Sequence, residues 1–197
     1  MSNSLLRRKK KYEYKNGTYV SFVGSTIDYP DPLFFKYYSM IKSWIHKKEY
    51  DVTTITHEEK ELAQKNPGFH EKLLSEIQEK IKNSEQLVII LKSPIADTED
   101  SWCNHEIHYA VDRHNLPIIV AYLDTDYILD PMHFYEYWPL SLKCRILSNK
   151  ASCIHIPFRK EPFKDAVAQF SKQNKPKGNS MGVYSEKAYE IFGIKTS

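Results

Sequence analysis

Two uninterrupted apolar runs constrain the fold of this chain more than any other feature. They are QLVIIL, residues 86–91, and LPIIVAYLD, residues 116–124. Neither run alternates polar with apolar side chains, and this is typical of parallel strands that helices cover on both faces. Apolar residues at helical spacing follow Ser101, between the two runs. We therefore expect two buried parallel strands joined by a helix.

Further strands and helices are expected on both sides of this unit. The other strand candidates are TYVSFVG, DVTTIT and ASCIHIPF, at residues 18–24, 51–56 and 151–158. Apolar stripes predict helices over residues 34–45, 69–81, 163–170 and 184–192. Strands that alternate with helices in this order imply right-handed crossovers and an α/β fold with a doubly wound parallel sheet of about five strands. Functional groups are then expected at the carboxyl ends of the strands.

Four segments lack a clear period. HEEKELAQKNPG, residues 57–68, fits a functional loop or a loop with a partial helix, and its His57–Glu61 portion is expected to be solvated. The aromatic segment 124–150 is expected to pack over one edge of the sheet. Residues 1–16 are interpreted as a basic flexible leader, residues 17–171 as the α/β domain, and residues 172–197 as a linker and a C-terminal helix.

Charge and composition exclude several classes of protein. With 28 Lys and Arg against 25 Asp and Glu, the formal charge is +3, which does not favour nucleic-acid binding. No apolar stretch is long enough for a signal peptide or a membrane span, so a cytoplasmic protein without membrane contact is expected. The three widely spaced cysteines favour neither a disulfide framework nor a zinc site. The six glycines form no GxGxxG or P-loop, which argues against dehydrogenases and nucleotide triphosphatases.

The segment SPIADTEDSWCNHEIHYAVDRH, residues 93–114, carries the strongest candidate for chemistry. Helical spacing places Trp102 and Glu106 together, at the border of an apolar stripe that includes Cys103. Glu106 is then either a solvated charge near a helix start or a carboxylate that faces a cleft walled by the indole. His105 and His108 lack the H-E-x-x-H spacing, so no metal site is expected. Cys103 is expected to be an inert buried thiol.

The same residues resemble the TIR and TIR-like superfamily, in particular the bacterial TIR-like proteins of antiphage systems such as Thoeris. The resemblance depends on TYVSFVG as first strand, on KNSEQLVIILKSP around the third strand, and on D-S-W-C-N-H-E, which matches the motif S-x-W-C-x-x-E. It covers residues 18–170. The resemblance implies a flavodoxin-like three-layer fold with a five-stranded parallel sheet.

The resemblance also implies a site. Glu106 corresponds to the glutamate that cleaves the bond between nicotinamide and ribose in NAD+, and Trp102 to a residue that lines the substrate pocket. The loop after the second strand, residues 56–68, corresponds to a region that contacts NAD+ or a neighbouring subunit. The loop after the first strand supplies further substrate-binding candidates, which are Phe22, Gly24, Ser25, Asp28 and Tyr29. NAD+ is the substrate, and no cofactor or metal is implied.

The implied function is that of an NAD+ glycohydrolase or cyclase. A carboxylate near the ribose would stabilise the positive charge that develops as nicotinamide leaves. Family members of this type make a cyclic ADP-ribose-like signal that activates a separate effector protein, and activity can require self-association. Two alternatives stay open: a TIR-like assembly module without chemistry, and an enzyme like the nucleoside deoxyribosyltransferases.

Overall fold

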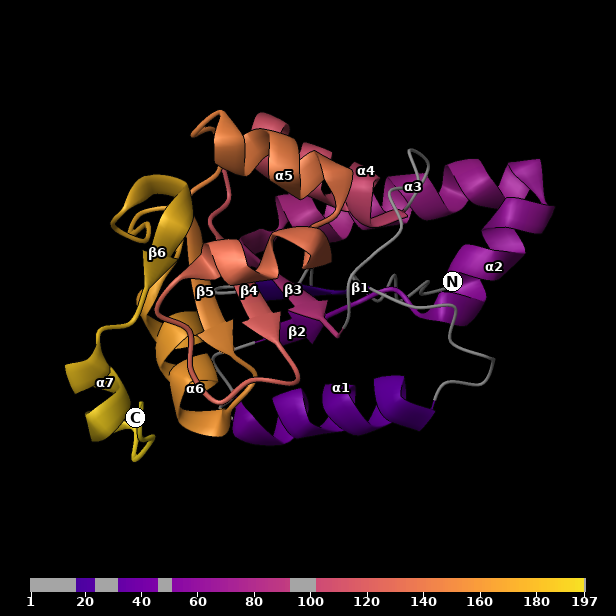
Figure 1. The fold of residues 1–197 in the computed structure, drawn as a ribbon. Coiled ribbons are helices and arrows are strands. Elements are labelled where there is room, and N and C mark those ends of the chain that lie inside the picture. The colour runs from indigo at the N-terminus through magenta and orange to yellow at the C-terminus, as the bar shows by residue number, and fades with distance from the viewer. Residues whose placement is uncertain (1–16, 24–31, 46–50, 93–101, 197) are drawn as a thin grey trace, which may run out of the picture.

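The computed structural model describes residues 17–23, 32–45, 51–92 and 102–196. Within them, six strands form one parallel sheet in the order β2-β1-β3-β4-β5-β6 (Figure 1). The strands are β1 (Gly17–Val23), β2 (Asp51–Thr53), β3 (Ser84–Leu91), β4 (Ile118–Tyr122), β5 (Cys153–Pro157) and β6 (Gly182–Val183). The predicted parallel α/β class is confirmed, but the predicted number of five strands is wrong.

The sixth strand lies within residues 172–197, which were expected to form a linker and a helix. β6 pairs with β5 through two residues, Gly182 beside Ile154 and Val183 beside His155. Gly182 suits this approach because a Cβ there would lie 2.6 Å from the Cys153 carbonyl oxygen. A two-residue strand has no measurable period, so its sequence did not indicate it. The helix expected after it is present as α7 (Glu186–Ile191).

Helices cover both faces of the sheet (Figure 1). One face packs against α3 (Pro67–Lys82), α4 (Trp102–His108), the π-helical turn η1 (Tyr109–Arg113) and α5 (Leu140–Leu147). The other packs against α1 (Pro32–Trp44), α6 (Lys160–Gln169) and α7. The structure is therefore a three-layer α/β fold, in agreement with the flavodoxin-like expectation.

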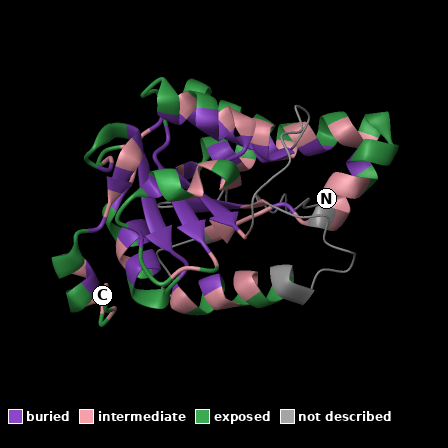
Figure 2. Ribbon diagram, in the orientation of Figure 1, coloured by how far each residue is buried: buried purple, intermediate pink, exposed green. Residues whose placement is uncertain are grey.

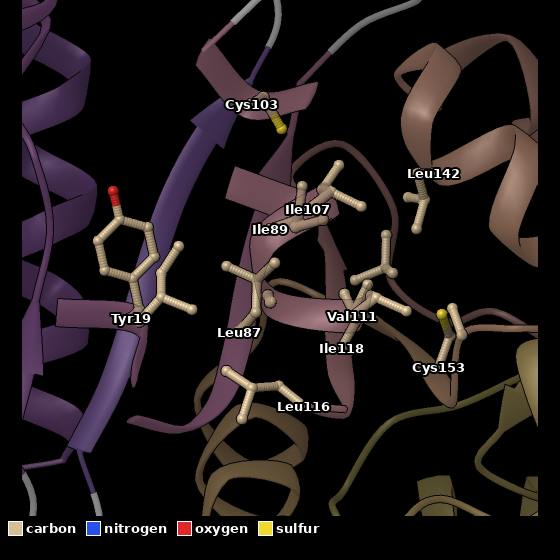
Figure 3. Packing of buried hydrophobic residues seen from close by; sticks show 14 of the residues in the cluster. Tyr19, Leu87, Ile89, Cys103, Ile107, Val111, Leu116, Ile118, Leu142 and Cys153 are labelled. Atoms are coloured by element: carbon tan, nitrogen blue, oxygen red, sulfur yellow. The ribbon is translucent and has the colours of Figure 1, made fainter. Parts of the chain in front are cut away.

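The two central strands are buried on both faces, as their apolar runs predict (Figure 2). Successive side chains of β3 point to opposite faces, so Leu87 and Ile89 join one core cluster while Val88 and Ile90 join the other. Figure 3 shows the first cluster, in which Leu87 and Ile89 lie near Ile107 of α4. The sheet thus separates two apolar cores.

Residues 57–65 form a helix, α2 (His57–Lys65), so the alternative of a partial helix within residues 57–68 is confirmed, and the expectation of a solvated loop at His57–Glu61 is wrong. Thr56 caps this helix: its hydroxyl accepts the Glu59 amide, and the Glu59 carboxylate accepts the Thr56 amide at 2.7 Å. This reciprocal pair satisfies two backbone donors and can start a helix with little apolar periodicity. Asn66 ends α2 and caps α3, where Pro67 takes the first position.

Residues 131–147 form the 3-10 helix η2 (Pro131–Tyr137) and α5, and they pack on a face of the sheet rather than over its edge. Trp138 is fully buried there, and its indole N–H donates to the Tyr122 hydroxyl at 2.7 Å. Phe134 packs against the same Tyr122 ring, with centroids 4.4 Å apart. These contacts explain the dense aromatic composition of the segment. Among the described residues, no helix has the length and apolar character needed to cross a membrane.

Candidate active site

Glu106 is the centre of the candidate site, and its side chain is fully buried. Its Oε1 accepts a hydrogen bond from the Tyr19 hydroxyl at 2.8 Å and forms an ion pair with the Lys60 ammonium at 2.7 Å. Its Oε2 accepts a hydrogen bond from the Ser21 hydroxyl. Each carboxylate oxygen therefore has a donor, which offsets the cost of removing the charge from water.

Three elements far apart in the sequence bring these donors together. Tyr19 and Ser21 are two positions apart on β1, so both point to the sheet face that α4 covers. Figure 3 shows Tyr19 on this face together with Cys103 and Ile107 of α4. Lys60 comes from α2. The site therefore exists only when β1, α2 and α4 are all in place.

Burial beside Glu106 keeps the Tyr19 hydroxyl and the Cys103 thiol uncharged. Burial, reinforced by the Glu106 carboxylate, raises the pKa of the Tyr19 hydroxyl well above its usual range, so Tyr19 acts as a hydrogen-bond donor. Burial, together with the Glu106 carboxylate, raises the pKa of the Cys103 thiol to about 12, although Lys60 and Ser21 oppose the shift. Because the thiolate is the nucleophilic form, Cys103 is inert here, as its position on the apolar stripe predicts.

The burial of Glu106 changes both interpretations that the sequence left open. Glu106 is not a solvated charge on a helix surface, because none of its surface is exposed. It also does not face an open cleft, because Tyr19, Ser21 and Lys60 surround the carboxylate. Trp102 and Glu106 are both buried residues of α4, in agreement with the predicted shared face. The groups that bind the carboxylate are those of Tyr19, Ser21 and Lys60 rather than the indole.

Trp102 instead lines a pocket of about 400 Å³ with Gln64, His70 and His105. The His70 ring packs on the indole with centroids 4.8 Å apart, and the centroid of the His105 ring lies 6.4 Å from that of the indole. Helices α2, α3 and α4 supply these four side chains. Glu106 follows Trp102 by about one turn of α4. The pocket is therefore lined by the helix that carries Glu106, although Glu106 is not among its lining residues, and it offers aromatic surface to a planar ring.

Of the other predicted substrate-binding residues, the structure describes Phe22, and it is not brought to Glu106. Phe22 lies on β1 between Ser21 and Val23, and it packs with the core cluster on the opposite face of the sheet. Gly24, Ser25, Asp28 and Tyr29 lie outside the described residues. Among the described residues, no three His, Cys, Asp or Glu side chains are grouped in a way that could hold a metal ion.

Three residues of the site were not predicted: Tyr19, Ser21 and Lys60. Alternation along TYVSFVG does place Tyr19 and Ser21 on one face, so β1 carried a usable signal. No comparable signal marks Lys60 within residues 56–68, because a lysine within HEEKE looks like an ordinary surface charge.

Comparison with known protein families matches residues 19–127 to the TIR-like domain of the Thoeris protein ThsB. The match spans more than half of the chain and includes most of β1 and all of α2 and α4. The chain belongs to this ThsB TIR-like family. A search of curated proteins gave no match. Since Thoeris is an antiphage system, membership supports an antiphage TIR-like role. The matched region contains Glu106 and all three of its donors.

Proposed function

We propose that this protein cleaves NAD+ between nicotinamide and ribose, with Glu106 as the catalytic carboxylate. The observation that supports this most is the fixed position of Glu106, whose carboxylate accepts hydrogen bonds from Tyr19 and Ser21 of β1 within the family-matched region. A carboxylate held in a water-poor site interacts with a developing positive charge more strongly than it would in bulk water. That is the interaction which glycosidic bond cleavage requires.

The reaction is balanced without a cofactor. Nicotinamide leaves with the electron pair of the C–N bond and becomes neutral, while the ribose carbon acquires positive charge. Attack by water gives ADP-ribose and a proton, and attack by a nucleophile of the same molecule gives a cyclic ADP-ribose. Glu106 would stabilise the charged ribosyl group or hold its hydroxyls. We propose a cyclic product that reaches a separate effector through the cytosol.

The pocket lined by Trp102 would receive one ring of the dinucleotide. Its volume of about 400 Å³ lies within the usual range for small-molecule sites, roughly 300 to 1,000 Å³. Trp102 and His70 offer aromatic rings that are tilted by 40° to each other, while Gln64 and His105 offer polar atoms. Trp102 is thus proposed to bind substrate.

Because Glu106 is fully buried, the proposed reaction requires a form of the protein in which its carboxylate is uncovered. Self-association on activation is the proposed source of that form. The protein should therefore be tested after isolation from phage-infected cells as well as from uninfected cells.

The experiment compares NAD+ cleavage by the parent protein with that by Glu106→Gln, which keeps the shape and removes the charge. Mass spectrometry would detect nicotinamide together with the linear or cyclic product. The expected result is a loss of at least about 100-fold in Glu106→Gln, typical of removing one charge-stabilising group. Glu79→Gln, at an exposed position on α3, is the control and should match the parent. Equal activity of Glu106→Gln and the parent would refute the proposal.

A non-catalytic assembly module is the second candidate, and the complete pairing of Glu106 favours it. A buried carboxylate with a donor on each oxygen is also what a purely structural charge cluster contains. Under this alternative, Glu106→Gln would lower stability, and neither protein would release nicotinamide when taken from infected cells.

A further inference from the structure

Lys60 differs from the other two partners of Glu106 in how firmly it is held. The Tyr19 and Ser21 side chains belong to β1 inside the sheet, with exposures of 0% and 1%. The Lys60 side chain is 13% exposed and reaches Glu106 from α2, outside the sheet. Of these three donors, Lys60 alone could withdraw without disturbing a strand.

Helix α2 is only lightly anchored to the core. Among its residues with described side chains, Ala63 is the buried one, while Leu62 is 58% exposed. The helix ends at Asn66, whose extended backbone separates α2 from α3. Figure 1 places α2 at the outer end of the helix layer, beside the start of α3. Elements with few buried contacts are those that open at low free-energy cost.

The ammonium of Lys60 opposes the chemistry proposed for Glu106. At 2.7 Å from Oε1 it neutralises the carboxylate charge that the proposed reaction would use to stabilise a ribosyl cation. A substrate with its own positive charge, such as the nicotinamide ribosyl group of NAD+, could replace the ammonium and leave the buried carboxylate paired. Exchange of one cation for another avoids leaving an uncompensated charge.

We propose that Lys60 masks Glu106 in this structure, and that withdrawal of Lys60 on α2 uncovers the carboxylate for NAD+. This inference rests on the proposed function for its catalytic consequence. The masking itself can be measured without any catalysis.

The first measurement tests access to Glu106. Lys60→Met removes the charge but keeps an unbranched side chain, Lys60→Arg keeps the charge, and Lys65→Met changes an exposed lysine of the same helix as a control. The full chain would be treated with a carbodiimide and glycine ethyl ester, and modification of Glu106 would be quantified by peptide mass spectrometry. Masking predicts modification in Lys60→Met well above that in the parent, Lys60→Arg and Lys65→Met.

The second measurement follows nicotinamide release from NAD+ by the same proteins without activation. Masking predicts a rate about tenfold or more above the parent for Lys60→Met, because the apparent affinity for a ligand rises with the fraction of protein that is already in the binding-competent state. Lys60→Arg and Lys65→Met should match the parent. The double variant Lys60→Met with Glu106→Gln should lose the gain. Structural damage alone would lower the rate, so an increase is specific to masking.

The outcomes separate the two proposals. If infected-cell parent protein cleaves NAD+ through Glu106, but Lys60→Met shows neither faster cleavage nor greater modification of Glu106, masking is wrong and the proposed function stands. If Glu106 is modified only after Lys60 is changed, yet no form cleaves NAD+, masking stands and the enzyme proposal fails. Circular dichroism would verify folding, and Lys60→Gln would replace Lys60→Met if the latter does not fold.

Discussion

At the scale of single residues, the buried carboxylate of Glu106 determines what its neighbours must be. A charge removed from water is tolerated only when it is paired and hydrogen-bonded. Tyr19, Ser21 and Lys60 meet that requirement together. Each donor therefore contributes to stability whether or not the site is catalytic.

Tyr19→Phe tests this contribution. The change removes the hydroxyl that donates to Glu106 at 2.8 Å and leaves the ring in place. Because a hydrogen bond to a buried charged group is lost, the free energy of unfolding should fall by about 2 kcal/mol. Urea unfolding would measure it. Tyr127→Phe, at an exposed ring, should change stability by less than about 0.5 kcal/mol, and an equal loss in both variants would contradict this account.

The sequence predicted the residues of the site unevenly. Trp102 and Glu106 stood out because a short motif on a helix after a buried strand is a local pattern. The burial of Glu106 could not be predicted, because it depends on Lys60, 46 positions earlier, reaching across from α2. A side-chain contact between distant segments leaves no periodic signal in either one.

At the scale of elements, a fully buried histidine links β5 to the segment that carries β6. The Tyr122 hydroxyl accepts from the Trp138 indole, and because the imidazole is neutral and its Nε2 faces a carbonyl oxygen, the hydroxyl donates to His155 Nδ1 at 2.8 Å. His155 Nε2 then carries the proton and donates to the Ser180 carbonyl oxygen at 3.0 Å. This chain of bonds requires a neutral imidazole, since both ring nitrogens of the charged form are donors.

Stability should therefore depend on pH through His155. Burial lowers the pKa of His155 to about 4, against 6.5 when unfolded, although the Ser180 carbonyl opposes the shift. The unfolded chain binds the proton more readily, so the contribution is present above pH 6.5 and is lost as the pH falls towards 4. The loss should reach about 3 kcal/mol. Urea midpoints between pH 7 and 4 would show it, with a shallower slope in His155→Gln and an unchanged slope in His133→Gln, whose side chain is exposed.

Elements with a long period were predicted well, and elements defined by capping or by a few backbone bonds were not. β3 and β4 followed from apolar runs, and α3 from a stripe that ends up buried at Leu73, Ile77 and Ile81. α2 was expected only as a partial helix, and only as one of two alternatives, because its start depends on the Thr56 and Glu59 capping pair rather than on apolar spacing. β6 was missed because its position depends on its partner, β5.

At the scale of the whole molecule, the C-terminal residues belong to the fold. Tyr184 and Tyr189 are buried in the core on the α1 and α6 side of the sheet. The Tyr189 hydroxyl accepts the Ile128 amide and donates to the Ile128 carbonyl. The tail thus ties the loop after β4 to the sheet edge.

Removal of residues 172–197 should consequently destabilise the protein. The truncation leaves His155 without the Ser180 carbonyl and uncovers apolar surface that Tyr184 and Tyr189 bury. Loss of buried aromatic side chains costs several kcal/mol, so the melting temperature should fall by about 10 °C or more. Calorimetry would measure it. Removal of residues 195–197 serves as the control, and similar melting of the parent and the longer truncation would show that the tail is dispensable.

The order of strands and helices predicted the three-layer architecture because right-handed crossovers leave few ways to arrange parallel strands. The burial of Glu106 could not be predicted at this scale either. It depends on where α2 sits relative to the sheet, and strand order does not specify the position of a lightly packed helix.

Within the residues that the structure describes, both edge strands of the sheet are very short, with three residues in β2 and two in β6. Beyond β2, the Thr54 hydroxyl already bonds the Val20 carbonyl oxygen at 2.7 Å, which occupies part of the β1 margin. Short margins resist the addition of strands from another molecule. If copies of this protein polymerise on activation, they should join through helices and loops. Fibre diffraction of such filaments would then lack a meridional cross-β reflection near 4.8 Å.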